Sequence, residues 1–402
     1  MTSTTSELEE QDRIAALEEL ELVDTPPEER FDRVVRLAQH LFGVPYAALN
    51  LVGDDRHYTK AAGSDLFGGA ASSLPRSHSL CALTVQDDHT LEITDLRADA
   101  AFADHPLTGG SDVRYYAGAP LRAPGGQRIG SLCLIDVEPR DALDEREQTL
   151  LRDLANWLER ELAIGADLEQ GAELQRRLLP RTIPDLPGWE IAGRCVQAGA
   201  VGGDFYDWQL IRGTAQVQVV LADVMGKGIR AALIAAGVRA ILRGASPHNS
   251  LEASITRVAD DMQDDLGESA SFVTLFAARF DPRDGALEYV DAGHGLAFLV
   301  GPDRGERLAG DGLPLGAVPG VTWTPVGGQV HPGEALVLVS DGFLDVHGDT
   351  GTVLEVVRSA LATSEDAESL AATLAGSAVG SLTSDDVTVV VALRGEPAAQ
   401  SR

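Results

Sequence analysis

Residues 217–233, VQVVLADVMGKGIRAAL, contain the strand-to-helix transition that decides the fold of the second half of the chain. The apolar run 217–224 predicts a buried strand, and a helix is predicted over 229–243, after two glycines. Asp223 therefore stands at the end of a strand, where side chains from several strands converge easily.

Three further aspartates lie at the ends of β-rich runs beside glycine or another acid: Asp204 in GGDFYD (202–207), Asp341 in SDG (340–342) and Asp385 in SDDVT (384–388). Carboxylates that lie close together raise each other's pKa unless a cation compensates their charge. Aspartate oxygens are hard ligands that suit Mg²⁺ or Mn²⁺ rather than zinc. The four aspartates predict a two-metal site, with the alternative that each belongs to an ordinary turn.

Further elements are predicted on both sides of these motifs. Strands are predicted at 189–196, 204–211, 272–280, 287–290, 296–300, 335–339 and 387–393, and helices at 251–266, 353–361 and 366–379. Helix pairs inserted between runs of antiparallel strands predict two packed sheets flanked by helices.

The first half of the chain predicts a separate α+β domain. A helix with the apolar stripe Phe31, Val34 and Ala38 is predicted to end at Gly43, and strands are predicted at 46–52, 90–93, 114–121 and 128–135. These runs indicate an antiparallel sheet with flanking helices.

A long connecting helix is predicted between the halves, because no proline interrupts residues 143–179. Its apolar stripe follows a seven-residue repeat and includes Leu151, Leu154, Leu158 and Leu168. We expect this stripe to pair with a second copy of the chain in a parallel homodimer; the alternative is that it packs on the chain's own domains.

Composition excludes several classes of partner. The 402 residues contain 32 Lys and Arg against 62 Asp and Glu, and the net charge of −30 repels nucleic acid and anionic lipid. No apolar run is long enough to span a membrane. Three cysteines give no disulfide framework. We expect a cytoplasmic protein that binds neither membrane nor nucleic acid.

The cysteines leave one alternative open. His78 and Cys81 have an H-x-x-C spacing that could hold a metal or attach a tetrapyrrole, but two such residues alone are weak evidence, and a buried structural cysteine is the favoured interpretation. Cys133 and Cys195 lie in apolar strand patterns, where cysteine behaves as a small hydrophobe. No redox role is expected for any of the three.

The first half resembles the GAF sensory domains of bacterial signalling proteins. The resemblance lies in DTPPEERFD (24–32), RSHSLC (76–81), FADHP (102–106), YAGAPL (116–121) and GSLCLID (130–136). It implies a sensor fold and leaves the ligand unspecified.

The second half resembles the bacterial PP2C-type serine/threonine phosphatases of the SpoIIE and RsbU group. The motifs GGDFYD, DVMGKG (223–228), DAGHG (291–295), LPLG (313–316), SDG and DDVT (385–388) occur in the order of that family. The resemblance implies a GAF domain over 1–142, a connecting helix over 143–180 and a phosphatase domain with a PP2C-like α-β-β-α sandwich over 181–402.

The resemblance also implies a metal-dependent mechanism. Asp223 would bridge two Mn²⁺ or Mg²⁺ ions, with the Val224 carbonyl on one of them, Asp341 and Asp385 on the other, and Asp204 acting directly or through water. The ions would activate water for attack on phosphorus, so no catalytic protein nucleophile is expected. The roles of Asp207, His294, Asp345 and Asp386 stay open.

The resemblance finally implies a function. We expect a protein serine/threonine phosphatase that is regulated by its GAF domain and dephosphorylates an anti-sigma-factor antagonist in partner-switching signalling. The alternative is a non-catalytic scaffold with a degenerate phosphatase domain, and the presence of all four aspartates favours the enzyme.

Overall fold

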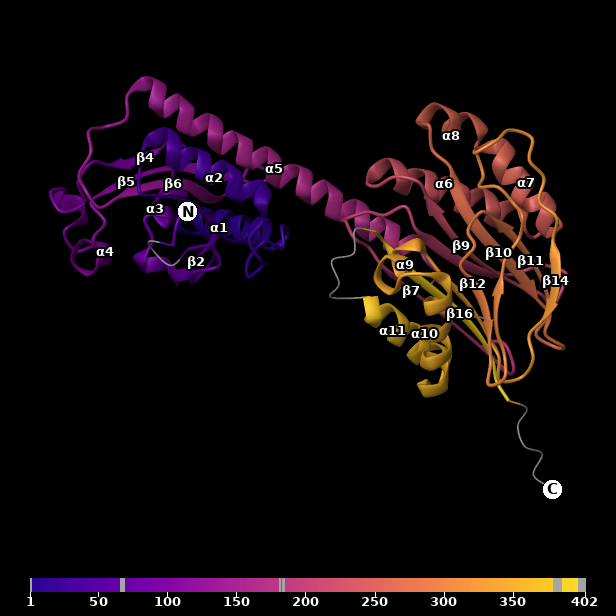
Figure 1. Cartoon of the computed structure of the whole chain (residues 1–402). Helices are drawn as coiled ribbons and strands as arrows, with labels where there is room; N and C mark the ends of the chain where they lie inside the picture. The colour runs from indigo at the N-terminus through magenta and orange to yellow at the C-terminus, as the bar shows by residue number, and fades with distance from the viewer. Residues whose placement is uncertain (1, 66–68, 181, 183–184, 379–384, 397–402) are drawn as a thin grey trace. The chain divides into compact units, whose positions relative to one another are not determined.

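The computed structural model describes the chain except for residues 1, 66–68, 181, 183–184, 379–384 and 397–402. The chain divides into two compact units, Met1–Asp167 and Leu168–Arg402, and the division falls inside the long helix α5 (Glu145–Leu178) (Figure 1). No helix in the described ranges is both long and apolar enough to cross a bilayer.

The first unit is built on an antiparallel sheet with the strand order β3-β2-β1-β6-β5-β4. Its strands are β1 (Tyr46–Val52), β2 (Arg56–Ala62), β3 (Ser73–Pro75), β4 (Leu91–Ile93), β5 (Tyr115–Arg122) and β6 (Arg128–Asp136). Its helices besides α5 are α1 (Thr2–Glu18), α2 (Glu29–Phe42), the short α3 (Cys81–Thr84) and α4 (Pro106–Gly110), and the single turns η1 (Arg76–His78) and η2 (Ala100–Phe102).

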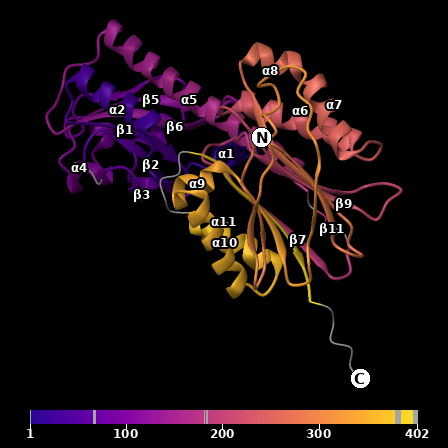
Figure 2. The same ribbon diagram turned by 45° about the vertical axis from the view of Figure 1, so that its right-hand side comes forward.

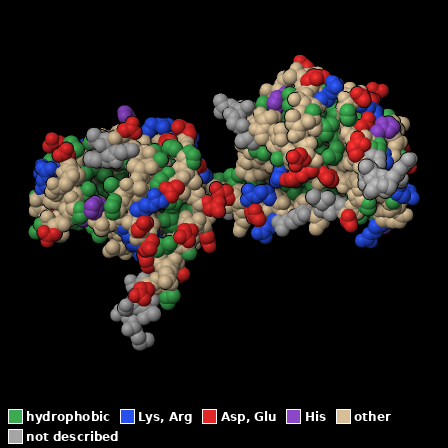
Figure 3. Space-filling model, turned by 90° about the horizontal axis from the view of Figure 1, so that it is seen from below, with side chains coloured by type: hydrophobic (Ala, Val, Ile, Leu, Met, Phe, Trp, Pro, Cys, Tyr) green, Lys and Arg blue, Asp and Glu red, His purple; other side chains and the backbone are tan. Residues whose placement is uncertain are grey.

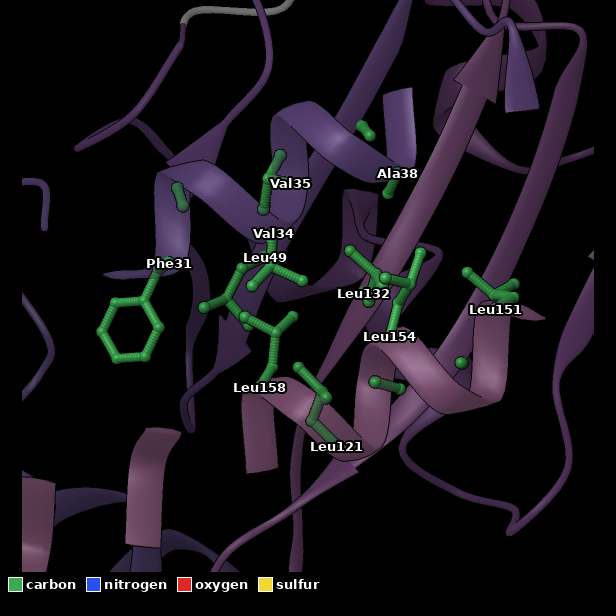
Figure 4. Packing of buried hydrophobic residues seen from close by; sticks show 14 of the residues in the cluster. Phe31, Val34, Val35, Ala38, Leu49, Leu121, Leu132, Leu151, Leu154 and Leu158 are labelled. Atoms are coloured by element: carbon green, nitrogen blue, oxygen red, sulfur yellow. The ribbon is translucent and has the colours of Figure 1, made fainter. Parts of the chain in front are cut away.

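The two faces of this sheet are covered differently, because successive strand residues point to opposite sides. One face packs against α1, α2 and the first part of α5 through a continuous apolar core (Figure 4). Helix α2 contributes Phe31, Val34 and Ala38 and ends at Gly43, whose φ of 58° suits glycine. The other face is covered by α3 and adjoining loops over a second cluster.

The leucines predicted to pair with a second chain lie inside the first unit. Leu151 and Leu158 are fully buried, Leu154 is 5% exposed, and all three join α2 and the sheet in the core of Figure 4. The prediction of a dimer contact through them is therefore wrong, since the sheet already buries this stripe. The exposed apolar side chains of α5 are instead Ile164, Leu174 and Leu178.

The second unit contains two antiparallel five-stranded sheets, with the orders β14-β11-β10-β9-β8 and β13-β12-β15-β16-β7. The first sheet comprises β8 (Phe205–Leu210), β9 (Val217–Val224), β10 (Val273–Phe280), β11 (Ala286–Ala292) and β14 (Val326–Gln329). The second comprises β7 (Trp189–Val196), β12 (Ala297–Val300), β13 (Gly305–Leu308), β15 (Ala335–Val339) and β16 (Val387–Arg394).

Helices cover the two outer faces of this pair of sheets (Figures 1 and 2). The first sheet packs against α6 (Ile229–Ala245), α7 (Leu251–Asp261) and α8 (Gln263–Ser269), and the second against α9 (Asp341–His347), α10 (Thr350–Thr363) and α11 (Ala367–Ala378). A third apolar core lies between the sheets. The predicted α+β class and α-β-β-α sandwich are confirmed; residue 379 of the predicted helix 366–379 lies outside the described residues.

Candidate metal centre

Strand alternation gathers polar side chains at one end of the space between the two sheets of the second unit. In β9, Val217, Val219 and Leu221 point between the sheets, so Asp223 continues the same face. The same alternation places further polar residues on this face at the ends of their strands: Asp204 before β8, Thr274 in β10, Ser340 after β15, and Asp386 and Thr388 at β16. Thr274 pairs directly with Asp223.

Asp204 and Asp223 form the buried part of the site. Asp204 is 3% exposed, and its Oδ2 has no hydrogen-bond partner in the described part of the chain. Burial and then the charge of Asp223 raise the pKa of Asp204 well above its ordinary value. The pKa of Asp223, which is hydrogen-bonded to Asp204, is raised to about 7 by burial and then by the neighbouring acids. Without a cation, this pair retains a proton near neutral pH.

Asp341 and Asp385 lie at the outer edge of the site. Asp341 begins α9, and the pKa of this exposed residue is raised by partial burial of its carboxyl and then by the charge of Asp385. Lys227 Nζ, from the DVMGKG loop, lies 3.2 Å from Asp385 Oδ2. An ammonium group thus offsets part of the negative charge at this edge.

Asp386 belongs to the same group, although its role was left open in the sequence analysis. It is 6% exposed, its Oδ1 accepts a hydrogen bond from Ala198 N at 2.9 Å, and its charge raises the pKa of Asp223. A Cβ on Gly202 would stand 1.9 Å from Asp386 Oδ2, so the loop before Asp204 needs glycine there. The sequence signal was the acidic pair directly before a buried strand.

The loop that carries Asp204 packs on the end of β9. Val224 N donates to Gly203 O at 3.4 Å, and a Cβ on Gly203 would lie 2.6 Å from Val224 O. The Val224 carbonyl that the sequence predicts as a ligand is therefore approached closely by Gly203. Only a residue without a side chain permits this approach.

Three residues of undecided role have other surroundings. Asp207 is held by Arg243 at 2.5 and 2.9 Å, with Arg239 at 3.4 Å, so its carboxylate is compensated by two guanidinium groups. His294 is buried, which lowers its pKa to about 4, and its Nδ1 lies 3.4 Å from Thr274 Oγ1. Asp345 lies on α9, where its charge contributes to raising the pKa of Asp341.

The donor set fits hard divalent cations in its chemistry. The carboxylates raise one another's pKa, and a nearby cation would lower these pKa values again. In addition, Asp204 Oδ2 is buried and has no hydrogen-bond partner among the described residues. Within the described ranges, no three Asp, Glu, His or Cys side chains are already arranged to hold an ion. Binding would therefore have to draw these carboxylates closer together, and carboxylate oxygens are ligands of the kind that Mg²⁺ and Mn²⁺ prefer.

Family models match both units. Residues 213–394 match Stage II sporulation protein E (SpoIIE), and residues 26–162 match the GAF domain. The chain therefore contains a GAF domain, followed by a SpoIIE-type phosphatase domain of the PP2C kind. Asp223, Asp341 and Asp385 lie within the matched segment, and Asp204 precedes it.

Two curated relatives are similar to parts of this chain. Protein IcfG of Synechocystis is 28% identical over 263 residues, which are 57% of this chain and 41% of that protein. Phosphoserine phosphatase RsbU of Bacillus subtilis is 26% identical over 195 residues, 47% of this chain and 56% of that protein. The chain thus spans less than two thirds of the length of either relative.

One of the solved structures that are similar to part of this chain contains metal. The catalytic domain of the Mycobacterium tuberculosis serine/threonine phosphatase PstP, in complex with two manganese ions, is 20% identical, with a TM-score of 0.42 over 52% of this chain and 99% of that chain.

Proposed function

We propose that the second unit is a metal-dependent phosphatase that removes phosphate from serine or threonine of a partner protein. The observation that carries this proposal is the cluster of mutually repelling carboxylates around Asp204 and Asp223. Such a cluster repels a phosphate group, so activity on phosphate requires cations that reverse the sign of the local field. When bound, two Mn²⁺ or Mg²⁺ ions would acidify water and neutralise phosphoryl oxygens.

The residues of the site would then have distinct roles in holding the two ions and positioning the loops around them. Asp223 and the Val224 carbonyl would hold one side of the two-ion site, Asp341 and Asp385 the other, and Asp204 would act directly or through water. Asp386 would hold the Asp204 loop in place through Ala198 N. Lys227, 3.2 Å from Asp385, supplies a positive charge at the rim where a phosphate would enter.

The surroundings of the site favour a protein substrate. Met225 lies within the DVMGKG motif and Ile229 and Leu233 follow it, and these three side chains are 42%, 58% and 68% exposed. Exposed apolar side chains beside a charged site suit the docking of another protein better than of a small phosphate ester. With RsbU among the relatives, a phosphorylated anti-sigma-factor antagonist is the proposed substrate class, and the GAF unit is the proposed regulator, its ligand unspecified.

The test is Mn²⁺-dependent hydrolysis of a phosphoserine peptide by the full chain. Asp223→Asn and Asp341→Asn each remove a negative ligand, and we expect turnover to fall by about 10²-fold or more. Asp303→Asn, an exposed residue of the same unit, is the matched charge control and should keep wild-type turnover. If either ligand variant keeps its fold and turns over at nearly the wild-type rate, the alternative of a non-catalytic signalling scaffold is favoured.

We further propose that the chain is a homodimer through the part of α5 that the second unit contains. Leu174 and Leu178 are 60% and 41% exposed and lie one turn apart on the same helix face. Light scattering on Leu174→Glu/Leu178→Glu should then give a monomer. A wild-type chain that is already monomeric at micromolar concentration rules this out.

A further inference from the structure

A polar side chain, that of Asn50, is buried under α3 of the first unit, beside two cysteines of the apolar cluster there. Asn50 of β1 and Cys133 of β6 point to the same face of the sheet, where Cys81 at the start of α3 covers them. Cys81 is 3% exposed, and Asn50 and Cys133 are equally inaccessible, at 3% and 0%. Two thiols and an amide are thus enclosed together.

A single amide group connects the two thiols. Asn50 Nδ2 lies 3.2 Å from Cys81 Sγ and 3.2 Å from Cys133 Sγ, and the two thiols are hydrogen-bonded to one another. Asn50 Oδ1 has no hydrogen-bond partner in the described part of the chain. The sulfurs are therefore the partners that orient this amide.

The two cysteines differ in their surroundings. Cys81 Sγ also accepts from Tyr116 Oη at 3.5 Å, and Tyr116 Oη is itself 2.6 Å from Thr84 Oγ1. The hydrogen bond from Cys133 lowers the pKa of Cys81 well below its ordinary value despite burial. The hydrogen bond to Cys81, together with burial, raises the pKa of Cys133. Cys81 thus accepts from Tyr116 as well as from Asn50, and these donors stabilise its thiolate, which is the reactive form of a thiol.

A metal does not explain this pair. His78, the other residue of the H-x-x-C spacing, is exposed while Cys81 is buried. Among the described residues no group of three metal-binding side chains contains either cysteine. The interpretation of both as inert small hydrophobes also fails to account for an amide directed at both sulfurs.

We propose that Cys81 and Cys133 form a peroxide-sensitive dithiol, in which Cys81 is oxidised first and Cys133 closes an intramolecular disulfide. The Cys81 thiolate attacks one oxygen of hydrogen peroxide, the O–O bond breaks, and the hydroxide leaving group takes a proton to become water. The Cys133 thiolate then attacks the sulfur of Cys81 sulfenic acid and expels hydroxide, which takes up the proton that Cys133 lost. Two thiols and one peroxide give one disulfide and two waters.

The disulfide would change the first unit at a defined place. It would link the start of α3 to β6, the central strand beside β1. In the reduced chain, α3 packs on β5 and β6 without a covalent bond. The disulfide would therefore link α3 covalently to β6.

The test uses the full chain, hydrogen peroxide, alkylation of remaining thiols after denaturation, and mass mapping of non-reduced peptides. We expect a Cys81–Cys133 disulfide, with Cys195, which lies on β7 of the second unit, still alkylated. Cys133→Ser should accumulate a dimedone-reactive sulfenic acid on Cys81, while Cys81→Ser should leave Cys133 reduced. Cys195→Ser is the matched control and should form the disulfide at the wild-type rate.

A further variant separates reactivity from folding. Asn50→Leu keeps the branched shape of the side chain but removes the hydrogen bond to both sulfurs, and it should slow oxidation of Cys81 about tenfold. Cooperative unfolding of this variant would show that its fold is intact. The proposal is overturned if Cys81 and Cys133 both stay reduced in the native chain under conditions that oxidise them after unfolding, or if Cys195 oxidises before them.

Discussion

Gln175, in the last turns of α5, holds the backbone of Gly202 from both sides. Its Nε2 donates to Gly202 O at 2.7 Å, and its Oε1 accepts from Gly202 N at 3.1 Å. Gln197 Nε2 donates to the same Oε1 at 2.9 Å. Because Gly202 lies two residues before Asp204, these hydrogen bonds connect α5 to the loop that carries a proposed metal ligand.

Replacing this glutamine should therefore weaken the metal site without touching a ligand. Gln175→Ala leaves the Gly202 backbone groups unpaired, at about 1–3 kcal/mol, so we expect Mn²⁺-dependent activity to fall by about tenfold. Glu173→Ala, which breaks only ion pairs to Arg176 and Arg177 on the same helix, is the control. Equal activity of the two variants in Mn²⁺ titrations would show that the hydrogen bonds between Gln175 and Gly202 do not affect activity.

Metal should stabilise the second unit. Ions that bind only the folded state at about 100 times their Kd contribute about 2.7 kcal/mol, which for a unit of this size raises Tm by about 5–10 °C. Asp223→Asn should respond far less in Mn²⁺, yet should be more stable than wild type without metal, since one repelling charge is gone. Calorimetry of both chains with and without Mn²⁺ measures these changes in Tm. An equal rise in Tm for both chains would indicate nonspecific binding of Mn²⁺, since the protein has a net charge of −30 and its acidic side chains are spread widely over the surface (Figure 3).

Gly203→Ala should be severe, because its Cβ would lie 2.6 Å from the Val224 carbonyl and one of the two backbones must move. We expect loss of most activity, with a modest decrease in Tm. The control is Gly244→Ala in α6, where a Cβ meets no atom within 4 Å and alanine favours the helix by about 0.5–1 kcal/mol. Full activity in Gly203→Ala would contradict the close contact.

An acid-dependent prediction concerns Glu10 of α1. Hydrogen bonds from Arg13, assisted by Arg76, lower the pKa of Glu10 to about 2. A carboxyl with a lowered folded-state pKa stabilises the fold fully above its ordinary pKa, and this contribution is lost as pH falls from about 4.5 to 2. Since Glu10 is about one-third exposed, we expect about 1 kcal/mol. Urea unfolding of Glu10→Gln against wild type at pH 7 and pH 3 should show a clearly smaller difference in stability at pH 3 than at pH 7.

The gathering of Asp204 and Asp223 at one end of the two sheets could be predicted from sequence because these residues flank apolar strands, and apolar runs such as 217–224 and 335–339 are strong strand signals. The burial of Asp386 was not predicted, because a charged residue beside a proposed ligand is usually a solvated turn acid. Its burial depends on the close approach of Gly202, which the sequence does not reveal.

Strand β2 and the packing of α5 could not be predicted from sequence, because tertiary contacts override the local sequence pattern there. Strand β2, RHYTKAA, has no apolar alternation, yet Lys60 is fully buried there with its Nζ 2.7 Å from Glu28 and 2.8 Å from Pro26 O. Likewise, the leucine stripe of α5 satisfies a coiled-coil repeat and an intramolecular core equally well. Only the position of the sheet face decides between them.

The alternation in β9 makes the second unit sensitive to a kind of change that substitutions do not test. Removing or adding one residue between Val217 and Asp223 would invert every later side chain of the strand, sending Asp223 toward α6 and Val224 between the sheets. Length changes should consequently be tolerated in the β8–β9 hairpin at 212–216 but not inside the strand. Among homologous chains, alignment gaps in this region should fall on the hairpin alone.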